Sequence, residues 1–146
     1  MKLENPVFCA LDTTEISRAI ALARDLEGRV GGIKLGMEFF NAQGPAGYQA
    51  VAETGLPIFL DLKLNDIPNT VAGGIRAVLR LKPAIVNVHT AGGSAMMRAA
   101  ADAAREAGAG RPLIIGVTML TSLDQADLAD TGVSGSPSDH VRRLAG

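Results

Sequence analysis

Residues 59–71 read Phe59-Leu60-Asp61-Leu62-Lys63-Leu64-Asn65-Asp66-Ile67-Pro68-Asn69-Thr70-Val71. The apolar pattern predicts a buried strand. Side chains alternate faces along a strand, so we expect Asp61 and Lys63 on one face and the leucines on the other. Burying two full charges costs several kcal/mol unless they are paired or used. The stretch therefore predicts a charged site at the end of a buried strand, where α/β enzymes carry their chemistry.

On both sides of this stretch, short apolar runs alternate with patterns of helical period. The predicted strands are 6–11, 32–35, 58–62, 85–89 and 113–117, each bounded by glycine or proline. The predicted helices between them are 14–27, 45–53, 68–80 and 94–106. Strictly alternating βα units predict parallel strands with right-handed crossovers.

The C-terminal stretch differs from the rest. Residues 118–138 are polar and rich in turn residues, with one helical turn expected around 124–130 and a further helix from about 138. A (β/α)8 barrel needs about 250 residues, so five of its units fit in 146 residues and eight do not. We therefore expect an α/β fold of the barrel type, with residues 1–146 as the N-terminal portion of one barrel domain.

Composition narrows the class of protein. Hydrophobic residues make up 47 % of the chain, charged residues 20 %, and the net charge is −1. Without a basic run or interleaved aromatics, neither nucleic acid nor a membrane surface is a predicted partner. The single cysteine, Cys9, excludes an internal disulfide and is expected to be a buried thiol. The N-terminus shows no apolar leader and no stretch could span a bilayer, so the cytoplasm is the predicted location.

Several polar residues follow predicted strands. Lys34 closes the second strand, at the end where barrel active sites assemble. Asp12 follows the first strand and could contact a ligand or form a capping box with Glu15. Asp66 could cap the next helix, or form with Asp61 and Lys63 a charge set that keeps the lysine protonated.

Weaker candidates lie on the fourth and fifth strands. Asn87 and His89 share one face of the fourth strand, where a lone histidine is more often a core residue than a catalyst. Gly92-Gly93-Ser94 opens a helix and could bind an anion, although glycines are frequent at such turns. Hydroxyls at Thr118, Thr121 and Ser122 could contact a polar ring or merely cap a turn. With no metal-ligand cluster, Walker A loop or GxGxxG motif, a site of lysines and aspartates without a cofactor is predicted.

The run from Asp61 to Val71 resembles the signature of the orotidine 5′-phosphate decarboxylase family, which completes de novo UMP synthesis. Flanking features agree in order and spacing: Ala10-Leu11-Asp12, Ile33-Lys34-Leu35-Gly36-Met37-Glu38, Val86-Asn87-Val88-His89-Thr90-Ala91-Gly92-Gly93 and Gly116-Val117-Thr118-Met119-Leu120-Thr121-Ser122. The D-x-K-x-x-D core is shared with related enzymes acting on sugar phosphates. The continuation Ile67-Pro68-Asn69-Thr70 favours the orotidylate enzyme.

The resemblance implies roles for these residues. Lys63 would stabilise and then protonate the C6 carbanion, with Asp61 beside the departing carboxylate. Lys34 would bond both the sugar and the neighbours of that carboxylate. Asp66 and Thr70 would reach the site of a second subunit, which implies a homodimer. The implied substrate-binding residues are Asp12, Lys34, Asp61, Leu62, Lys63, Leu64, Asn65, Asp66, Ile67, Pro68, Asn69, Thr70 and Thr121, with Ser122 as an alternative to Thr121.

One departure from the family pattern affects activity. In the family, three further βα units close the barrel and supply the residues that hold the phosphate. Since binding energy from the phosphate normally drives the chemical step, we expect weak or absent turnover from this chain alone. Two alternatives stay open: a magnesium-dependent sugar-phosphate decarboxylase or hexulose-phosphate synthase of the same superfamily, and a non-catalytic half-barrel that serves as a dimerisation module.

Overall fold

A five-stranded parallel sheet, in the order β1-β2-β3-β4-β5, organises the computed structural model, which describes residues 5–146. The strands are β1 (Phe8–Ala10), β2 (Gly32–Gly36), β3 (Ile58–Leu64), β4 (Ile85–His89) and β5 (Leu113–Val117). Every neighbouring pair is parallel. The prediction of an α/β fold with five parallel βα units is confirmed.

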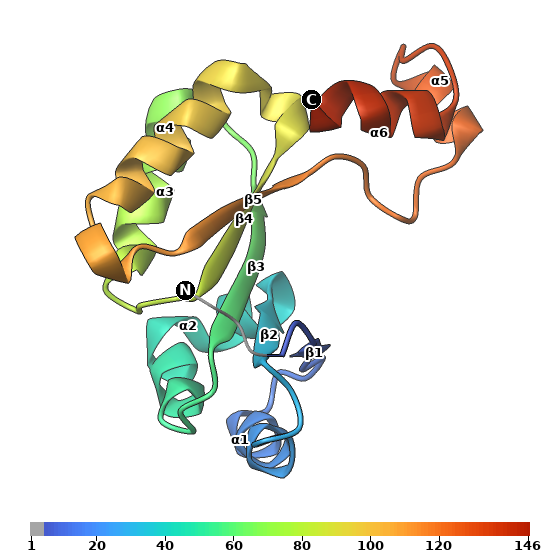
Figure 1. The fold of residues 1–146 in the computed structure, drawn as a ribbon. Helices are drawn as coiled ribbons and strands as arrows, with labels where there is room; N and C mark the ends of the chain where they lie inside the picture. The colour runs from blue at the N-terminus through green and yellow to red at the C-terminus, as the bar shows by residue number, and fades with distance from the viewer. Residues whose placement is uncertain (1–4) are drawn as a thin grey trace.

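Helices make the crossovers that parallel strands require. They are α1 (Ile16–Asp25), α2 (Met37–Ala52), α3 (Pro68–Leu79) and α4 (Gly93–Arg105), with 3-10 turns η1 (Thr90–Gly92) and η2 (Gly108–Gly110) beside α4. Helices α3 and α4 lie side by side along the sheet (Figure 1). The guanidinium of Arg76 joins them, since its Nε donates to both carboxylate oxygens of Glu106 at 2.9 Å.

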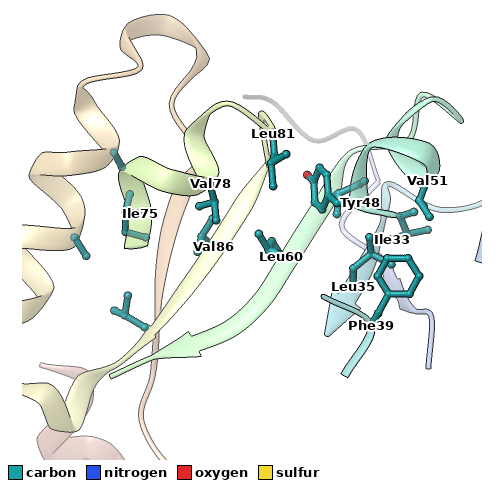
Figure 2. Packing of buried hydrophobic residues seen from close by; sticks show 14 of the residues in the cluster. Ile33, Leu35, Phe39, Tyr48, Val51, Leu60, Ile75, Val78, Leu81 and Val86 are labelled. Atoms are coloured by element: carbon teal, nitrogen blue, oxygen red, sulfur yellow. The ribbon is translucent and has the colours of Figure 1, made fainter. Parts of the chain in front are cut away.

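The core lies between the sheet and these helices (Figure 2). One face of each central strand supplies buried side chains to it: Ile33, Leu35, Ile58, Leu60, Val86 and Val88. Because side chains alternate along a strand, the residues between them project from the opposite face. Lys34, Asp61 and Asn87 are three of those residues, which separates the polar side chains from the apolar core.

Helix α2 is longer than predicted. Its first half, from Met37, follows β2 without a loop, whereas the predicted helix began at Pro45. Gly44 has φ 61° and precedes Pro45, so the two halves meet at a kink. The predicted start at Pro45 is wrong, since the chain only bends there: glycine tolerates positive φ and proline fits the first turn of a helix.

Smaller differences occur near the N-terminus. Strand β1 is three residues long rather than six, and Cys9 is half-buried rather than buried. Residues 1–4, on which the predicted absence of a leader partly rests, lie outside the described residues. Within residues 5–146, no helix is both long enough and apolar enough to cross a membrane.

The C-terminal stretch contains the two short helices that were predicted. They are α5 (Gln125–Asp130) and α6 (Pro137–Ala145), each opened by a capping box, from Asp124 with Asp127 and from Ser136 with Asp139. They extend away from the sheet on a long loop, and the C-terminal end of α6 returns towards η1 (Figure 1).

Candidate active site

Asp61 is at the centre of the candidate site, near the carboxyl end of β3. Only 6 % of the residue is exposed, and both of its carboxylate oxygens are bound. Oδ2 lies 3.0 Å from Nζ of Lys34, which β2 supplies, and Oδ1 lies 2.6 Å from Nζ of Lys63 on the same strand as Asp61. The predicted pairing of Asp61 with Lys63 is therefore present, with Lys34 as a second cation on the same carboxylate.

The two ammonium groups keep contact with solvent. The exposed fraction of the side chain is 26 % for Lys34 and 34 % for Lys63, against 8 % for Asp61. A buried carboxylate thus presents two partly exposed cations at the edge of the sheet. Such an arrangement can bind an anion or stabilise a negative charge that develops during a reaction.

The backbone of Lys63 departs from a regular strand. Its φ is 50°, in the left-handed region that residues other than glycine rarely adopt. The pairing of β3 with β4 shifts at the same place: Leu60 pairs with Val86 and Leu64 with Val88. Simple alternation of faces, which the sequence analysis assumed, therefore does not hold at Lys63.

Asn87 of β4 forms hydrogen bonds with both Asp61 and Lys63 where the pairing of β3 with β4 is irregular. Only 2 % of it is exposed; its Oδ1 accepts the backbone N–H of Lys63 at 2.7 Å, and its Nδ2 donates to Oδ1 of Asp61 at 2.6 Å. Asn87 is only a weaker candidate in the sequence, and its bonds to Asp61 and Lys63 emerge from the structure. An amide among Ile85, Val86 and Val88, on the strand next to Asp61, was the signal that could have identified it.

The environment of Asp61 favours its ionised form. Burial alone would raise the pKa of Asp61, but hydrogen bonds from Lys63, Asn87 and Lys34 to the carboxylate outweigh that effect. The pKa of Asp61 therefore lies below its ordinary value. Asp61 is a fixed negative charge at neutral pH.

Asp66 does not join this network within one chain. It is exposed, its Oδ1 accepts the N–H of Ile67 at 2.6 Å, and among the described residues no ion pair links it to Lys63. The predicted set of three alternating charges is therefore wrong for the single chain. The predicted helix cap is wrong as well, because α3 begins after Ile67 and no side chain caps it.

The other predicted ligand residues lie at the same edge of the sheet but outside the network. Asp12, Thr121 and Ser122 are exposed, and Thr118 and His89 are half-buried. The capping box of Asp12 with Glu15 is wrong, since the N–H of Glu15 bonds instead to Oγ1 of Thr13 at 3.1 Å. Gly93 begins α4, and the anion site predicted at Gly92-Gly93-Ser94 stays a prediction.

Across residues 5–146, no three histidine, cysteine, aspartate or glutamate side chains gather closely enough to hold a metal ion.

Comparison with known proteins agrees with this geometry. The sequence profile described as "Orotidine 5'-phosphate decarboxylase / HUMPS family" matches residues 5–146. The chain belongs to this family. It is 54 % identical over 145 residues to the orotidine 5'-phosphate decarboxylase of Paramagnetospirillum magneticum, covering 97 % of this chain and 62 % of that protein. The enzyme of the same name from Rhodospirillum rubrum is 54 % identical over 147 residues, covering 97 % and 60 %.

Solved structures of similar proteins share the fold. An orotidine 5'-phosphate decarboxylase from Lactobacillus acidophilus has a TM-score of 0.83 and 33 % identity, covering 97 % of this chain and 66 % of that one. An uncharacterized conserved protein from Geobacillus kaustophilus has a TM-score of 0.87 and 38 % identity, covering 96 % and 67 %. The chain therefore spans about 60 % of the length of the curated relatives it matches.

Proposed function

We propose that the chain converts orotidine 5′-phosphate to UMP and carbon dioxide without a cofactor, as a step of pyrimidine synthesis in the cytoplasm. One observation carries the proposal: the Lys63 ammonium lies 2.6 Å from a buried carboxylate that Lys34 also binds. The names of the relatives above support it, because they belong to proteins that match nearly the whole chain.

In the proposed reaction, the bond between C6 of the pyrimidine and its carboxylate breaks. Carbon dioxide leaves and the electron pair stays on C6. The Lys63 ammonium stabilises that charge and donates its proton to C6, which yields UMP, and solvent returns a proton to the lysine amine. An ammonium that is oriented beforehand stabilises a developing negative charge strongly, because no reorganisation is needed as the charge forms.

Asp61 and Lys34 would prepare the ammonium for this step. The Asp61 carboxylate holds the Lys63 ammonium by its Oδ1 and the Lys34 ammonium by its Oδ2. The carboxylate of the substrate would lie beside Asp61, where two negative charges disfavour the bound ground state and its loss as neutral carbon dioxide relieves their repulsion.

We propose the remaining substrate contacts from the positions of residues at the carboxyl ends of the strands. Asp12 would bind the ribose hydroxyls, Thr121 would lie near the pyrimidine, and the run from Asp61 to Thr70 would line the site. Support comes from exposure: Asp12, Thr121 and residues 65–70 are all exposed and follow the carboxyl ends of β1, β5 and β3. A ligand at this edge of the sheet could therefore reach each of them.

The proposed active unit is a homodimer in which Asp66 and Thr70 enter the partner's site. Residues 65–70 are all exposed in the single chain, and Ile67 has 67 % of its surface exposed. The Asp66 carboxylate has only a local hydrogen bond to Ile67. An apolar side chain beside an available carboxylate suits an interface that adds a charge to a second site.

The first test is titration of the chain with a 6-substituted UMP analogue, together with an assay of carbon dioxide release from orotidine 5′-phosphate. Lys63→Gln should abolish turnover. Lys82→Gln is the matched control, because Lys82 is exposed, has φ 53° against 50° for Lys63, and loses the same charge. Equal turnover by wild type and Lys63→Gln would contradict the proposal.

A second experiment tests whether the C-terminal part present in the longer relatives is needed for binding. Barrels bind phosphate after strands seven and eight, and residues 5–146 form five strands, so we expect weak turnover from these residues alone. Adding the separately produced C-terminal part of the Paramagnetospirillum magneticum relative should strengthen binding of the analogue. If the chain forms a stable oligomer that binds no analogue with or without the added C-terminal part, a non-catalytic half-barrel is favoured. Activity that requires magnesium would instead favour a sugar-phosphate decarboxylase or hexulose-phosphate synthase.

A further inference from the structure

Three residues of β3 lie opposite a single residue of β4 in the candidate site. Leu60 pairs with Val86 and Leu64 with Val88, which leaves Asp61, Leu62 and Lys63 opposite Asn87. A bulge of this kind breaks the ladder of backbone hydrogen bonds and redirects side chains. The backbone N–H of Lys63 has lost its regular strand partner and needs another acceptor.

The side chain of Asn87 provides that acceptor. Its Oδ1 lies 2.7 Å from the N–H of Lys63, and Asn87 is almost completely buried. The backbone of Lys63 is at φ 50°, a conformation that costs a residue other than glycine about 1–2 kcal/mol. Such strain persists only where surrounding structure imposes it, and the bond to Asn87 is the contact that acts directly on this N–H.

The other end of the same amide acts on Asp61. Nδ2 of Asn87 donates to Oδ1 of Asp61 at 2.6 Å, and that oxygen also accepts the Lys63 ammonium at 2.6 Å. The orientation of the amide is unambiguous, because an N–H can only be accepted by its oxygen and a carboxylate can only be bonded by its nitrogen. One side chain therefore fixes the backbone of one charged residue and the carboxylate of the other.

We propose that Asn87 is the positioning residue of this site: by bonding the Lys63 N–H and the Asp61 carboxylate at once, it directs the Lys63 ammonium to the reacting carbon. This inference rests on the proposed function for its chemical consequence, but its structural content stands without turnover. Asn87 is not itself proposed to touch the substrate. It holds the relative geometry of the two residues that do.

Two substitutions separate the two bonds. Asn87→Leu has a similar volume and removes both. Asn87→Asp keeps an acceptor for the Lys63 N–H but sets a second carboxyl group against Asp61, so the two titrate as a coupled pair. Asn41→Asp is the charge-matched control, because Asn41 is exposed on α2 and outside the network.

Nuclear magnetic resonance of the labelled chain gives readouts that need no activity. In Asn87→Leu, the Cα and Cβ shifts of Lys63 should lose their left-handed signature, and hydrogen exchange at its N–H should accelerate about 100-fold. The titration midpoint of Asp61 should rise, because the carboxylate loses the hydrogen bond from Asn87. In Asn87→Asp, Lys63 should keep its backbone signature while the carboxyl pair titrates in two steps.

Each outcome decides the proposal. A folded Asn87→Leu chain with wild-type Lys63 shifts, exchange and Asp61 midpoint overturns it. If Asn87→Leu does not fold, Asn87→Asp decides: a single Asp61 titration step at the wild-type midpoint overturns the proposal, and two steps support it. Asn41→Asp should leave all three readouts unchanged.

Kinetics provides the link to the reaction. Misplacement of a catalytic group by about 1 Å can cost about 100-fold in rate, so kcat of Asn87→Leu should fall about 10- to 100-fold while KM changes less than about 3-fold. An unchanged kcat would overturn the positioning role. Absence of turnover in the wild-type chain even after addition of the C-terminal part of the relative would instead count against the proposed function, and the resonance experiments would still decide the role of Asn87.

Discussion

The ammonium nitrogen of Lys63 lies 2.6 Å from Oδ1 of Asp61 although the backbone of Lys63 has φ 50°. An ion pair on a regular strand would need no such conformation. The strain accompanies a bulge in the pairing of β3 with β4, and the bulge directs Lys63 towards the same carboxylate that Lys34 binds. Strained backbone concentrates at functional sites, which agrees with the family assignment of this chain.

The strain can be measured with two matched pairs of variants. Lys63→Gly should be more stable than Lys63→Ala by about 1 kcal/mol, because both remove the ammonium and only glycine tolerates positive φ. Lys82, at φ 53° and outside the site, should show the same difference between its glycine and alanine variants. Urea denaturation gives both values. A difference near zero at Lys63 alone would mean that its backbone relaxes once the side chain is gone.

Much of the candidate site could be predicted from the sequence. Asp61 and Lys63 stood out because charges on a buried strand are costly, and Lys34 because the carboxyl ends of parallel strands meet at one edge. These are general rules of sheets, and they placed three of the four interacting side chains. Most of the helices and strands could also be predicted, since apolar periodicity depends only on local sequence.

The rest depends on contacts between segments that are distant in sequence. Lysine has no preference for positive φ, and the bond from the Lys63 N–H to Asn87 spans 24 residues, so no local pattern predicts that conformation. Asp66 follows the site at the expected spacing, but the turn before α3 leaves it exposed. The first half of α2 was missed because Gly44-Pro45 resembles a helix boundary, and only packing decides that the helix bends there.

The pH dependence of stability should identify Asp61 as an ionised group. Its pKa is lowered in the folded chain, so its stabilising contribution is present above the unfolded pKa, about 3.9, and is lost as pH falls through the lower folded pKa. Asp61→Asn should therefore lower the free energy of unfolding at pH 7 by about 1–3 kcal/mol. This lies between the losses of stability that follow from breaking a surface salt bridge and a buried one. Below about pH 4, the difference from wild type should shrink.

The measurement is urea denaturation of wild type and Asp61→Asn from pH 7 to the acid limit of folding. Asp124→Asn or Asp12→Asn would not serve as the control, because one caps α5 and the other is a proposed ligand residue. Asp25→Asn is suitable, since it lies at the end of α1 away from the site. A difference between wild type and Asp61→Asn that grows as pH falls would contradict the assignment of an ionised Asp61.

Replacement by alanine should change the stability of the chain in opposite directions at two glycines, Gly32 and Gly73. A Cβ on Gly32 would lie 2.5 Å from the carbonyl oxygen of Pro57 and against the ring of Phe8, so Gly32→Ala must displace backbone and should destabilise the chain by more than about 2 kcal/mol. A Cβ on Gly73 meets nothing within 4 Å. Gly73→Ala in the middle of α3 should stabilise the chain by about 0.5–1 kcal/mol. Thermal unfolding of both variants provides the comparison, and loss of stability in Gly73→Ala would mean that the outer face of α3 is packed in solution.

Mixing two inactive variants tests whether Asp66 acts in the partner's site. In the proposed homodimer, Lys63→Ala and Asp66→Asn each lose both sites, whereas a mixed dimer has one site with both residues intact. Random exchange in a two-fold dimer should restore about a quarter of the wild-type rate. Carbon dioxide release from the equimolar mixture measures this, with sedimentation to show that subunits have exchanged. A mixture of Lys63→Ala with Lys63→Gln is the control and should stay inactive. Exchange without any gain in rate would place Asp66 outside the partner's site.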